Sequence, residues 1–487
     1  MTRQAEIQDI GDEVAEMQAR AAVCGAVACG IIEMREKAKL YLPQKSRETD
    51  QEWKARRDEA EFFPAFAHAL GAYVGKPLGS PIIVQDIPSD IEAGLENVDL
   101  AGQNLDSFAR SILTAGLRDG ITWVVADYPK VMGAATLAQE RSMGVRPYLI
   151  HVPLENVVDF RCEVIPDGTH RCVHFRYKEC LRVADGRWGT KELERIRVLE
   201  PGLVEVWEKH VGIDGAVSWD LMPDESGPVT MDEIPVACFT PNREEWFEGT
   251  PPLEDLAWLN VTHWQSCSHQ RHVLNVARTP LLAGDSDARQ DPNAPIQIGV
   301  KGIILGIENL HYVEHSGSSI EAGERDIAML EDRMRRVAGQ MLVAQTGSKT
   351  ATESNHEANE GSSQLRNWVC NFQDFLEECL RLMALWVGKD QGGSVVIDME
   401  WDEESVGADV LAAVTNARVS GLISRETYLY NLQRADVLPP CVTVEEEIAR
   451  LEMEAPAPMP MAPLTSRKPK TATITKSDGT TSTVSME

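Results

Sequence analysis

The sequence has few of the features that place a chain in a class at once, beginning with its cysteines. There are ten among 487 residues, and no two form a Cys-x-x-Cys pair. In a chain of this length without an export signal, free buried thiols are the expected state. The cysteine pattern therefore predicts a reducing, cytoplasmic environment for the folded chain.

An export signal and a membrane span are also lacking. The first residues, "MTRQAEIQDIGDEVAEMQAR", are mixed and acidic, whereas a secretory signal has a basic start and an apolar centre. The apolar run that follows, "AAVCGAVACGII", is too short to cross a bilayer and is rich in small residues. We expect this run to form a packed helix and expect no membrane partner.

Basic residues are scarce. The chain has 47 of them against 76 acidic residues, a formal net charge of -29, while its 43% hydrophobic content is typical of a soluble globular protein. A surface this negative repels polyanions, which argues against tight, non-specific gripping of DNA or anionic lipid. The length is enough for roughly two to four domains with a substantial core.

Recognisable catalytic motifs are missing as well. The sequence contains no Gly-x-Ser-x-Gly elbow, no His-Glu-x-x-His pair and no glycine-rich dinucleotide loop. Carboxylates are abundant, but no spacing pairs them for acid–base chemistry. We therefore predict that the chain is not an enzyme and has no cofactor. An enzyme whose site assembles from scattered carboxylates and histidines stays as an alternative.

The stretch "LGAYVGKPLGSP" (70–81) superficially resembles a phosphate-binding loop. Its Gly71 and Gly75 are one residue too close, Pro77 follows Lys76 where a hydroxyl is needed, and a helix precedes it. The segment "GSKT" at Gly347 fails on the same grounds. A glycine C-cap and a turn before the strand "SPIIVQ" are the better interpretation.

One predicted helix contains four potential metal ligands. His263 and Cys267 are spaced for one helix face, but His269 and His272 lie largely on another face. No second group of ligands accompanies them, and a zinc site usually needs four. Core or interface packing is therefore favoured over a metal site.

The order of predicted elements is more informative. Helices dominate residues 1–75, an amphipathic helix covers "NLDSFARSILTAGLRDG", "ITWVVADYP" is a buried strand, and antiparallel strands fill about 145–240. A long helix begins at "PPLED" and is followed by a small β module, a second long helix and the polar segment "TGSKTATESNHEANEGSS". An apolar helix, one strand, a helical hairpin and a final helix come next. The end is a Pro-rich linker and a tail that is either a hairpin or disordered.

This order resembles that of phage portal proteins, the head-to-tail connectors of tailed bacteriophages. The segments that carry the resemblance are "YLP" with "EWKARRDEAEFFPAFAHALGAYVGKP", "LDSFARSILTAGLRDGITWVVADYP" and "PPLEDLAWLNVTHWQSCSHQRHVLNVARTP". The resemblance implies an α+β, mostly helical fold. Its expected parts are N-terminal helices with an α/β wing (1–250), a first stem helix (251–279), a β clip (280–316), a second stem helix (317–345), a tunnel loop and long helix (346–390), a returning wing strand (391–404), a helical crown (405–454) and a C-terminal tail (455–487).

The resemblance also implies roles for three sets of residues. The loop that touches passing DNA would contain Thr346, Gly347, Ser348, Lys349 and Thr350. The clip that contacts adaptors would contain Ile296, Ile298, Val300, Ile303 and Ile304. The stem interface would contain Arg325, Glu331, Arg333, Arg335 and Arg336. Alternatively, this last set is a solvated helix face with ion pairs inside one helix.

The function implied is structural. Portal proteins form a ring, of about twelve subunits, at one capsid vertex, and double-stranded DNA is packaged and ejected through it. The implied partners are other copies of the chain, the packaging terminase, tail adaptors and capsid proteins, in a virion assembled in the host cytoplasm. The acidic charge is consistent, because DNA slides past an acidic wall more easily than past clustered cations. The alternative within the same class is another structural or adaptor protein of the virion.

Overall fold

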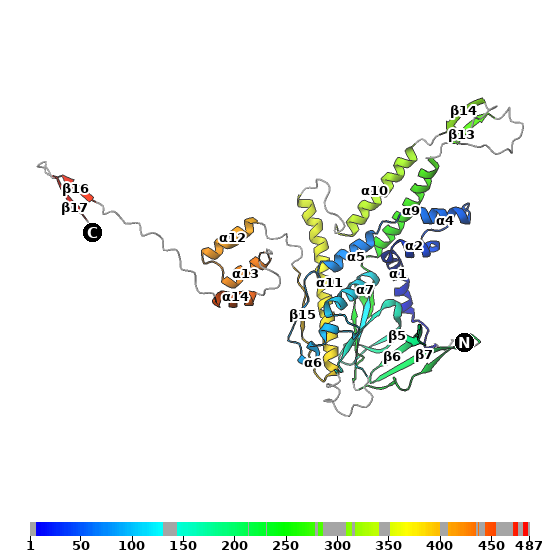
Figure 1. Cartoon of the computed structure of the whole chain (residues 1–487), viewed down its shortest axis with the longest axis horizontal. Coiled ribbons are helices and arrows are strands. Elements are labelled where there is room, and N and C mark those ends of the chain that lie inside the picture. Colours follow the sequence, from blue (N-terminus) through cyan, green and yellow to red (C-terminus); the bar gives the residue numbers. More distant parts are fainter. Residues whose placement is uncertain are drawn as a thin grey trace. The chain divides into compact units, whose positions relative to one another are not determined.

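The fold is α+β and mostly helical, as predicted, in a computed structural model that divides into two units, Met1–Trp401 and Asp402–Glu487 (Figure 1). None of the described helices is both long and apolar enough to cross a membrane. The structure describes residues 6–129, 144–212, 214–229, 231–277, 281–285, 308–313, 317–339, 351–399, 408–434, 437, 444–453, 471–475 and 481–485.

Helices fill the N-terminal part, as the sequence predicts. They are α1 (Asp12–Cys29), α2 (Ile31–Glu36), α3 (Ala38–Tyr41), α4 (Asp50–Glu59) and α5 (Ala65–Gly75). The apolar run of the sequence lies in α1 and the start of α2, and its Cys24 is fully buried. Thr49 starts α4 with a capping box, in which its hydroxyl accepts from Glu52 N. Pro64 precedes α5 and separates it from α4.

The glycines of "LGAYVGKPLGSP" do not form the C-cap that we predicted. Gly71 lies inside α5, Gly75 is its last residue, and neither has a positive φ. The cap is Lys76, in a right-handed conformation, with its N–H donating to Ala72 O at 3.0 Å. The short strand β1 (Ile83–Gln85) follows. The segment therefore connects a helix to a strand. It needs no left-handed glycine, because Lys76 keeps the right-handed helical conformation at the end of α5.

Helix α7 (Leu105–Asp119) follows the short α6 (Ser89–Glu92) and has the ends that the sequence predicts. The Asn104 side chain accepts from Ser107 N at 3.0 Å, and Gly120 ends the helix in the left-handed region at φ 85°. A Cβ on Gly120 would lie 2.3 Å from the carbonyl carbon of Thr250. The end of α7 and the chain just before α9 therefore approach at a distance that only glycine permits.

Two antiparallel sheets fill the region predicted to be antiparallel. In the first, β2 (Thr122–Asp127) lies between β3 (Tyr148–Pro153) and β10 (Val236–Phe239). The second has the order β4 (Val157–Val164), β5 (His170–Asp185), β6 (Gly189–Glu200), β7 (Leu203–Val211) and β8 (Val217–Leu221), and β9 (Gly227–Pro228) pairs with β7. A small hairpin of β11 (Arg243–Glu245) and β12 (Glu248–Gly249) leads towards α9.

The next elements follow the predicted order, with one correction. They are α9 (Glu254–Ala277), the antiparallel pair β13 (Leu281–Asp285) and β14 (Glu308–Val313), α10 (Ser318–Val337), α11 (Ala351–Trp386) and β15 (Ser394–Val396). We predicted a polar loop over 346–363, but α11 already begins at Ala351. Polarity misled the prediction, because Ala and Glu in this segment are strong helix formers whether or not a face is apolar.

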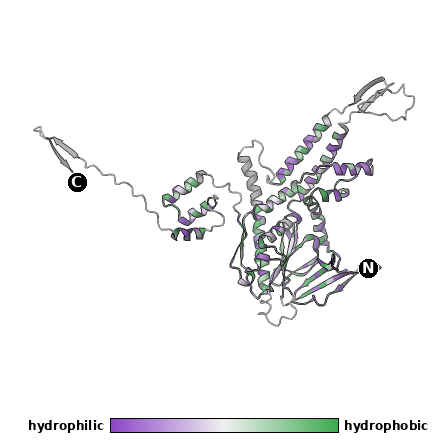
Figure 2. Ribbon diagram, viewed as in Figure 1, coloured by the Kyte–Doolittle hydropathy of each residue, from purple (hydrophilic) through white to green (hydrophobic). Residues whose placement is uncertain are grey.

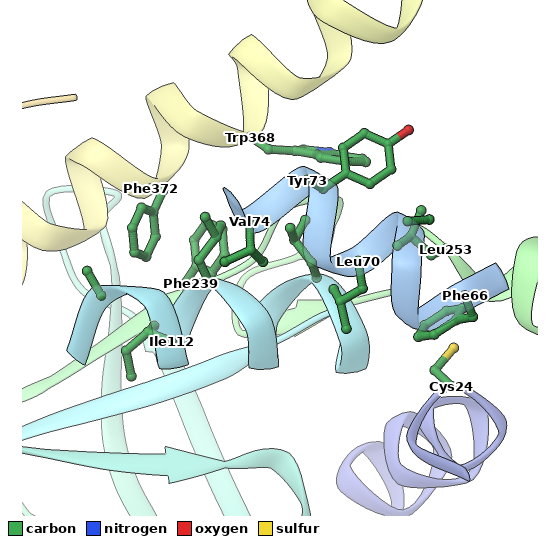
Figure 3. Packing of buried hydrophobic residues seen from close by; sticks show 14 of the residues in the cluster. Cys24, Phe66, Leu70, Tyr73, Val74, Ile112, Phe239, Leu253, Trp368 and Phe372 are labelled. Atoms are coloured by element: carbon green, nitrogen blue, oxygen red, sulfur yellow. The ribbon is translucent and has the colours of Figure 1, made fainter. Parts of the chain in front are cut away.

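The main core lies where α5, α7, β10 and α11 meet (Figure 3). Trp368 and Phe372 of α11 point towards α5 and α7, and the Phe239 ring of β10 lies 4.9 Å from that of Phe372. The Tyr73 and Trp368 rings are 5.4 Å apart. Phe239 also packs onto Gly116 of α7, where a Cβ would come within 2.3 Å of the ring. This aromatic packing makes the first unit rigid around α11.

The second unit contains α12 (Ala408–Val419), α13 (Arg425–Arg434) and α14 (Val444–Met453), which match the predicted helical hairpin and final helix. The antiparallel strands β16 (Thr471–Thr475) and β17 (Thr481–Ser485) follow. Of the two alternatives for the tail, the hairpin is the one found.

Candidate functional site

The candidate site is the stalk, which we define as α9, α10 and the β13–β14 hairpin between them in the sequence. Its first half is fixed to the body by Asn260, which is fully buried. The Asn260 Oδ1 atom accepts from Phe66 N at 3.0 Å, and its Nδ2 donates to Phe63 O at 2.9 Å. Because Pro64 has no side-chain acceptor to cap α5, Asn260 of α9 supplies the cap from another helix.

The second half of α9 is fixed by α4 and the chain before it. Arg56 is 6% exposed and forms a 2.6 Å ion pair with Glu48, and its Nη1 donates to Ser268 Oγ at 3.3 Å. The hydrogen bonds from Arg56 lower the pKa of Glu48 to about 2. Gln265 Nε2 donates to Tyr41 O at 2.7 Å. Several buried polar contacts therefore set the direction of α9.

Helix α10 packs along α9 through polar contacts at their shared face. Gln270 Nε2 donates to the Ile320 carbonyl at 3.0 Å, and Ser266 Oγ donates to Asp326 Oδ2 at 3.0 Å. Gly323 makes the first contact possible, since a Cβ there would lie 1.9 Å from Gln270 Oε1. The two helices approach closely at this point.

His263 forms a third contact between the helices. It is 3% exposed, its Nε2 lies 3.6 Å from Glu331 Oε1, and its ring is 5.9 Å from that of Phe63. Burial lowers the pKa of His263, and the Glu331 carboxylate acts in the opposite direction. The Cys267 sulfur lies 3.7 Å from the ring nitrogens of His263, so this predicted pair is in contact.

The other two potential ligands of α9 lie away from that pair. His269 is close to Lys45, Arg56 and Glu48, and His272 lines a cleft with the same charged residues. Within the described residues, no three His, Cys, Asp or Glu side chains are placed to share a metal ion. His263 instead packs between two helices and an aromatic ring.

The five residues predicted for the stem interface all lie on α10. Arg325 pairs with Glu321 at 3.8 Å, Arg335 with Glu331 at 3.5 Å, and Arg336 with Asp332, each one turn apart. Arg333 is exposed. Both interpretations of this set therefore stay open, because exposed pairs within a helix are weak and exchange partners readily.

The other two predicted sets fall outside the described residues. These are the tunnel-loop residues Thr346, Gly347, Ser348, Lys349 and Thr350, and the clip residues Ile296, Ile298, Val300, Ile303 and Ile304. Their roles remain predictions.

Two side chains of α11 that sequence reasoning missed direct the chain back to the N-terminal part. Gln373 Nε2 donates to Val395 O at 3.0 Å, and Glu377 Oε1 accepts from Val395 N at 2.9 Å. Strand β15 is thereby held on α11 and pairs antiparallel with β1, with Ile83 opposite Val396. The sequence shows that Gln373 and Glu377 are one helical turn apart, but it does not show that both bind the backbone of Val395.

Several carboxylates and histidines of the body have structural partners. A hollow of about 560 Å³ is lined by Asp374, Glu377, Glu378 and Arg381, among others. Glu378 is bound by Arg381 at 2.7 Å, and Glu377 holds β15. Half-buried His151 lies 2.8 Å from the Thr122 hydroxyl, and partial burial, with a smaller effect of Arg118, lowers the pKa of His151 to about 4. These contacts join neighbouring elements of the body.

Comparisons with known proteins give one family match and several structural matches. The model of a family described as a domain of unknown function (DUF4055) matches residues 252–387, from the start of α9 to the end of α11. No curated protein matches the chain.

Among solved structures, a chain in the virion of the native gene transfer agent (GTA) particle is 13% identical, with a TM-score of 0.37. That match covers 75% of this chain and 88% of the other. A chain in the neck of the native GTA particle, computed with C12 symmetry, is 12% identical with a TM-score of 0.36 and the same coverage of 75% and 88%.

Proposed function

We propose that this chain is a portal protein, which forms a ring-shaped channel for double-stranded DNA at one capsid vertex of a phage or phage-like particle. The observation that carries the proposal is the order of elements from α9 to β15. An antiparallel helix pair has a β hairpin inserted between its helices, a long helix follows, and the next strand returns to pair with β1. The resemblance implies the same order of parts, namely stem, clip, long helix and returning wing strand.

Two further properties support the proposal. The closing strand is held by Gln373 and Glu377 of α11, so the long helix and the N-terminal part form one continuous unit, as a ring subunit requires. The net charge of -29 suits a wall along which DNA must slide without binding tightly.

In this function the protein is a non-enzymatic conduit without a cofactor. The loop around Lys349 touches DNA as it passes, and the segment around Ile296 to Ile304 exchanges the packaging terminase for tail adaptors. Capsid proteins surround the ring, which is assembled in the host cytoplasm and remains in the virion.

Electron microscopy of the purified full-length protein tests the ring. We expect class averages with a central hole and rotational symmetry. A monomer, or a compact dimer without a hole, at all concentrations would overturn the proposal.

A second experiment separates a portal from another ring-forming virion protein. We expect the purified ring to bind the packaging terminase in a pull-down, and expect deletion of residues 347–350 to leave the ring intact but impair DNA packaging. A ring that does not bind the terminase and packages DNA equally well with the deletion would favour the adaptor alternative.

A further inference from the structure

One outer face of the stalk presents arginines, two of which also pair with acidic residues one turn earlier in α10: Arg325 with Glu321 and Arg336 with Asp332. Arg325, Met329, Arg333 and Arg336 are all exposed and recur three or four residues apart along α10. Arg325 lies about 180° around the helix from buried Met334, at about 100° per residue. Met329 and Arg336 lie within about 40° of Arg325, whereas Arg333 lies about 100° from Met334, at the edge of the stripe. Most of this arginine stripe therefore points away from α9. Hydrophilic and hydrophobic residues alternate along α10 in Figure 2, as expected for a helix covered on one side only.

A second face of the same chain is acidic. Helix α1 lies against the β11–β12 hairpin, where Arg20 of α1 pairs with Glu244 at 3.4 Å, and Glu13 and Glu16 of α1 act electrostatically on Glu248 together with Glu244 and Glu245. Burial raises the pKa of Glu248, and the four neighbouring carboxylates raise it further. These five glutamates repel one another, Arg20 offsets part of their charge through Glu244, and a further cationic partner would relieve the rest.

The acidic face is rigid, because the buried side chain of Phe247 anchors the turn of its hairpin. Phe247 has a φ of 67°, which side chains rarely adopt, and is 5% exposed. Its ring lies 5.7 Å from that of Phe160, and the neighbouring Trp246 ring stacks on it at 4.3 Å. A strained residue is kept only when its surroundings over-determine it. The glutamates on both sides of the turn are therefore positioned in advance.

An exposed tryptophan extends the acidic face along α9. Arg20 of α1 binds both Glu244, at 3.4 Å, and Glu254 of α9, at 3.1 Å. One turn after Glu254, Trp258 is 50% exposed, and its ring lies 6.4 Å from that of Tyr41. Tryptophan and arginine are the residues that most often dominate protein–protein interfaces.

The two faces point in different directions. Glu254 lies about 180° around α9 from His263, which contacts α10, at about 100° per residue. Figure 1 shows the same arrangement, with α10 on one side of α9 and α1 and α2 on the other. A subunit with two different complementary faces forms head-to-tail contacts, which close into a ring when the rotation allows.

We propose that the arginine stripe of α10 in one copy of the chain binds the acidic face formed by α1, β11–β12 and the start of α9 in the next copy. The partner is a second copy of this chain, because one face supplies cations with Met329 and the other supplies carboxylates with Trp258. The inference rests on the proposed ring and names the surfaces that build it.

Charge reversal of each face tests the inference. The first variant is Arg325→Glu, Arg333→Glu, Arg336→Glu, and the second is Glu13→Lys, Glu245→Lys, Glu248→Lys. We expect each alone to be monomeric by mass photometry. In a mixture, the natural arginine stripe of the second variant can bind the natural acidic face of the first. The reversed stripe of the first variant is acidic and can bind the reversed, basic face of the second. The mixture should therefore associate. The chain carrying all six substitutions should regain rings.

A matched control has three charge reversals away from both faces. Arg182→Glu, Arg187→Glu, Lys191→Glu changes exposed residues at the β5–β6 turn, and we expect this variant to form rings as the natural chain does. Rings from both triple variants would overturn the inference and leave the portal proposal standing. A natural chain that never forms rings would overturn the portal proposal itself.

A chemical cross-link removes the dependence on variants that fold poorly. Arg333→Lys keeps the positive charge and adds an amine that carbodiimide couples to a nearby carboxylate. We expect mass spectrometry of the assembled protein to find position 333 joined to Glu244, Glu245 or Glu248 of another copy. Links from position 333 only to carboxylates of its own α10 would contradict the inference.

Discussion

Helices α10 and α11 follow one another in the chain, yet they are held in different ways. Helix α11 buries large side chains along most of its described length, including Leu365, Phe372 and Met383, each at 0% exposure. Among the described residues of α10, only Leu330 and Met334 are buried apolar side chains, and Ala338 directly after the helix is buried as well. The other contacts that hold α10 are polar contacts with α9. The body is therefore stabilised mainly by apolar burial, and the stalk mainly by hydrogen bonds and ion pairs.

The difference indicates where a partner is needed. A helix covered on one side by a few polar contacts gains little stability from its own chain. A neighbouring copy that covers the outer side of α10 would add the missing contacts. Substitutions in α11 should thus change the stability of the subunit, and substitutions on the outside of α10 should change its assembly.

Truncation of Phe372 should have the largest effect. Phe372→Ala removes a fully buried ring that packs against Phe239, and we expect the free energy of unfolding to fall by about 3–5 kcal/mol. Met329→Ala, at a side chain that is 55% exposed, should change it by less than about 0.5 kcal/mol. Urea denaturation followed by tryptophan fluorescence, in the monomeric charge-reversal background, measures both. Equal losses would contradict the contrast between α10 and α11.

Removal of the α9 cap on α5 should have the next largest effect. Asn260→Ala leaves Phe66 N and Phe63 O buried without these partners, at a cost of about 2–4 kcal/mol. The control is Thr262→Ala, because the exposed Thr262 hydroxyl bonds only to Trp258 O within its own helix. Thermal denaturation compares the two. A loss for Asn260→Ala no larger than for Thr262→Ala would mean that water replaces the amide.

The sequence predicts elements better than it predicts these contacts. Asn104 and Gly120 mark the ends of α7 through interactions with near neighbours, so local pattern was sufficient. Asn260 caps a helix 194 residues earlier in the chain, and no local pattern indicates such a partner. The start of α11 at Ala351 was missed for another reason, since its polar residues give no apolar periodicity.

The two proposed interface faces also differ in how far the sequence alone predicts them. The charges of α10 were visible because they repeat along one helix, whereas the acidic face combines Glu13 with Glu248, which are distant in sequence. Only the fold brings those glutamates together. Helix existence thus follows from period and capping, while sites made from several elements require tertiary structure.

One histidine of the body and one of the stalk extend the comparison to the pH dependence of stability. His151 in the body has a pKa of about 4 in the folded chain, against about 6.5 when unfolded. Above pH 6.5 the histidine is neutral in both states and does not reduce the free energy of unfolding. As the pH falls towards 4 the unfolded chain binds the proton first, so the folded protein loses stability. Between pH 7.5 and 5.0 this loss is about 2 kcal/mol. His151→Gln should remove it. Urea midpoints at both pH values measure the difference.

His263 in the stalk provides the control for that experiment. Burial lowers the pKa of His263 as well, but Glu331 opposes the shift, so His263→Gln should remove a smaller part of the acid sensitivity. Glu331→Gln should increase the sensitivity, because the histidine then loses its carboxylate. An equal effect of the two histidine substitutions would show that Glu331 does not compensate for burial.

The smallest effect on the free energy of unfolding should come from Gly323→Ala, and its sign should depend on the neighbouring Gln270 side chain. Gly323→Ala places a methyl group against the Gln270 amide and breaks its 3.0 Å bond to Ile320 O, although alanine favours the helix by about 1 kcal/mol. The two terms oppose each other, so we expect a net loss of about 1 kcal/mol or less. In a Gln270→Ala background the clash is gone, and the same substitution should stabilise the protein. A double-mutant cycle of unfolding free energies measures this reversal, and a loss of equal size in both backgrounds would mean that the α9–α10 approach does not require glycine.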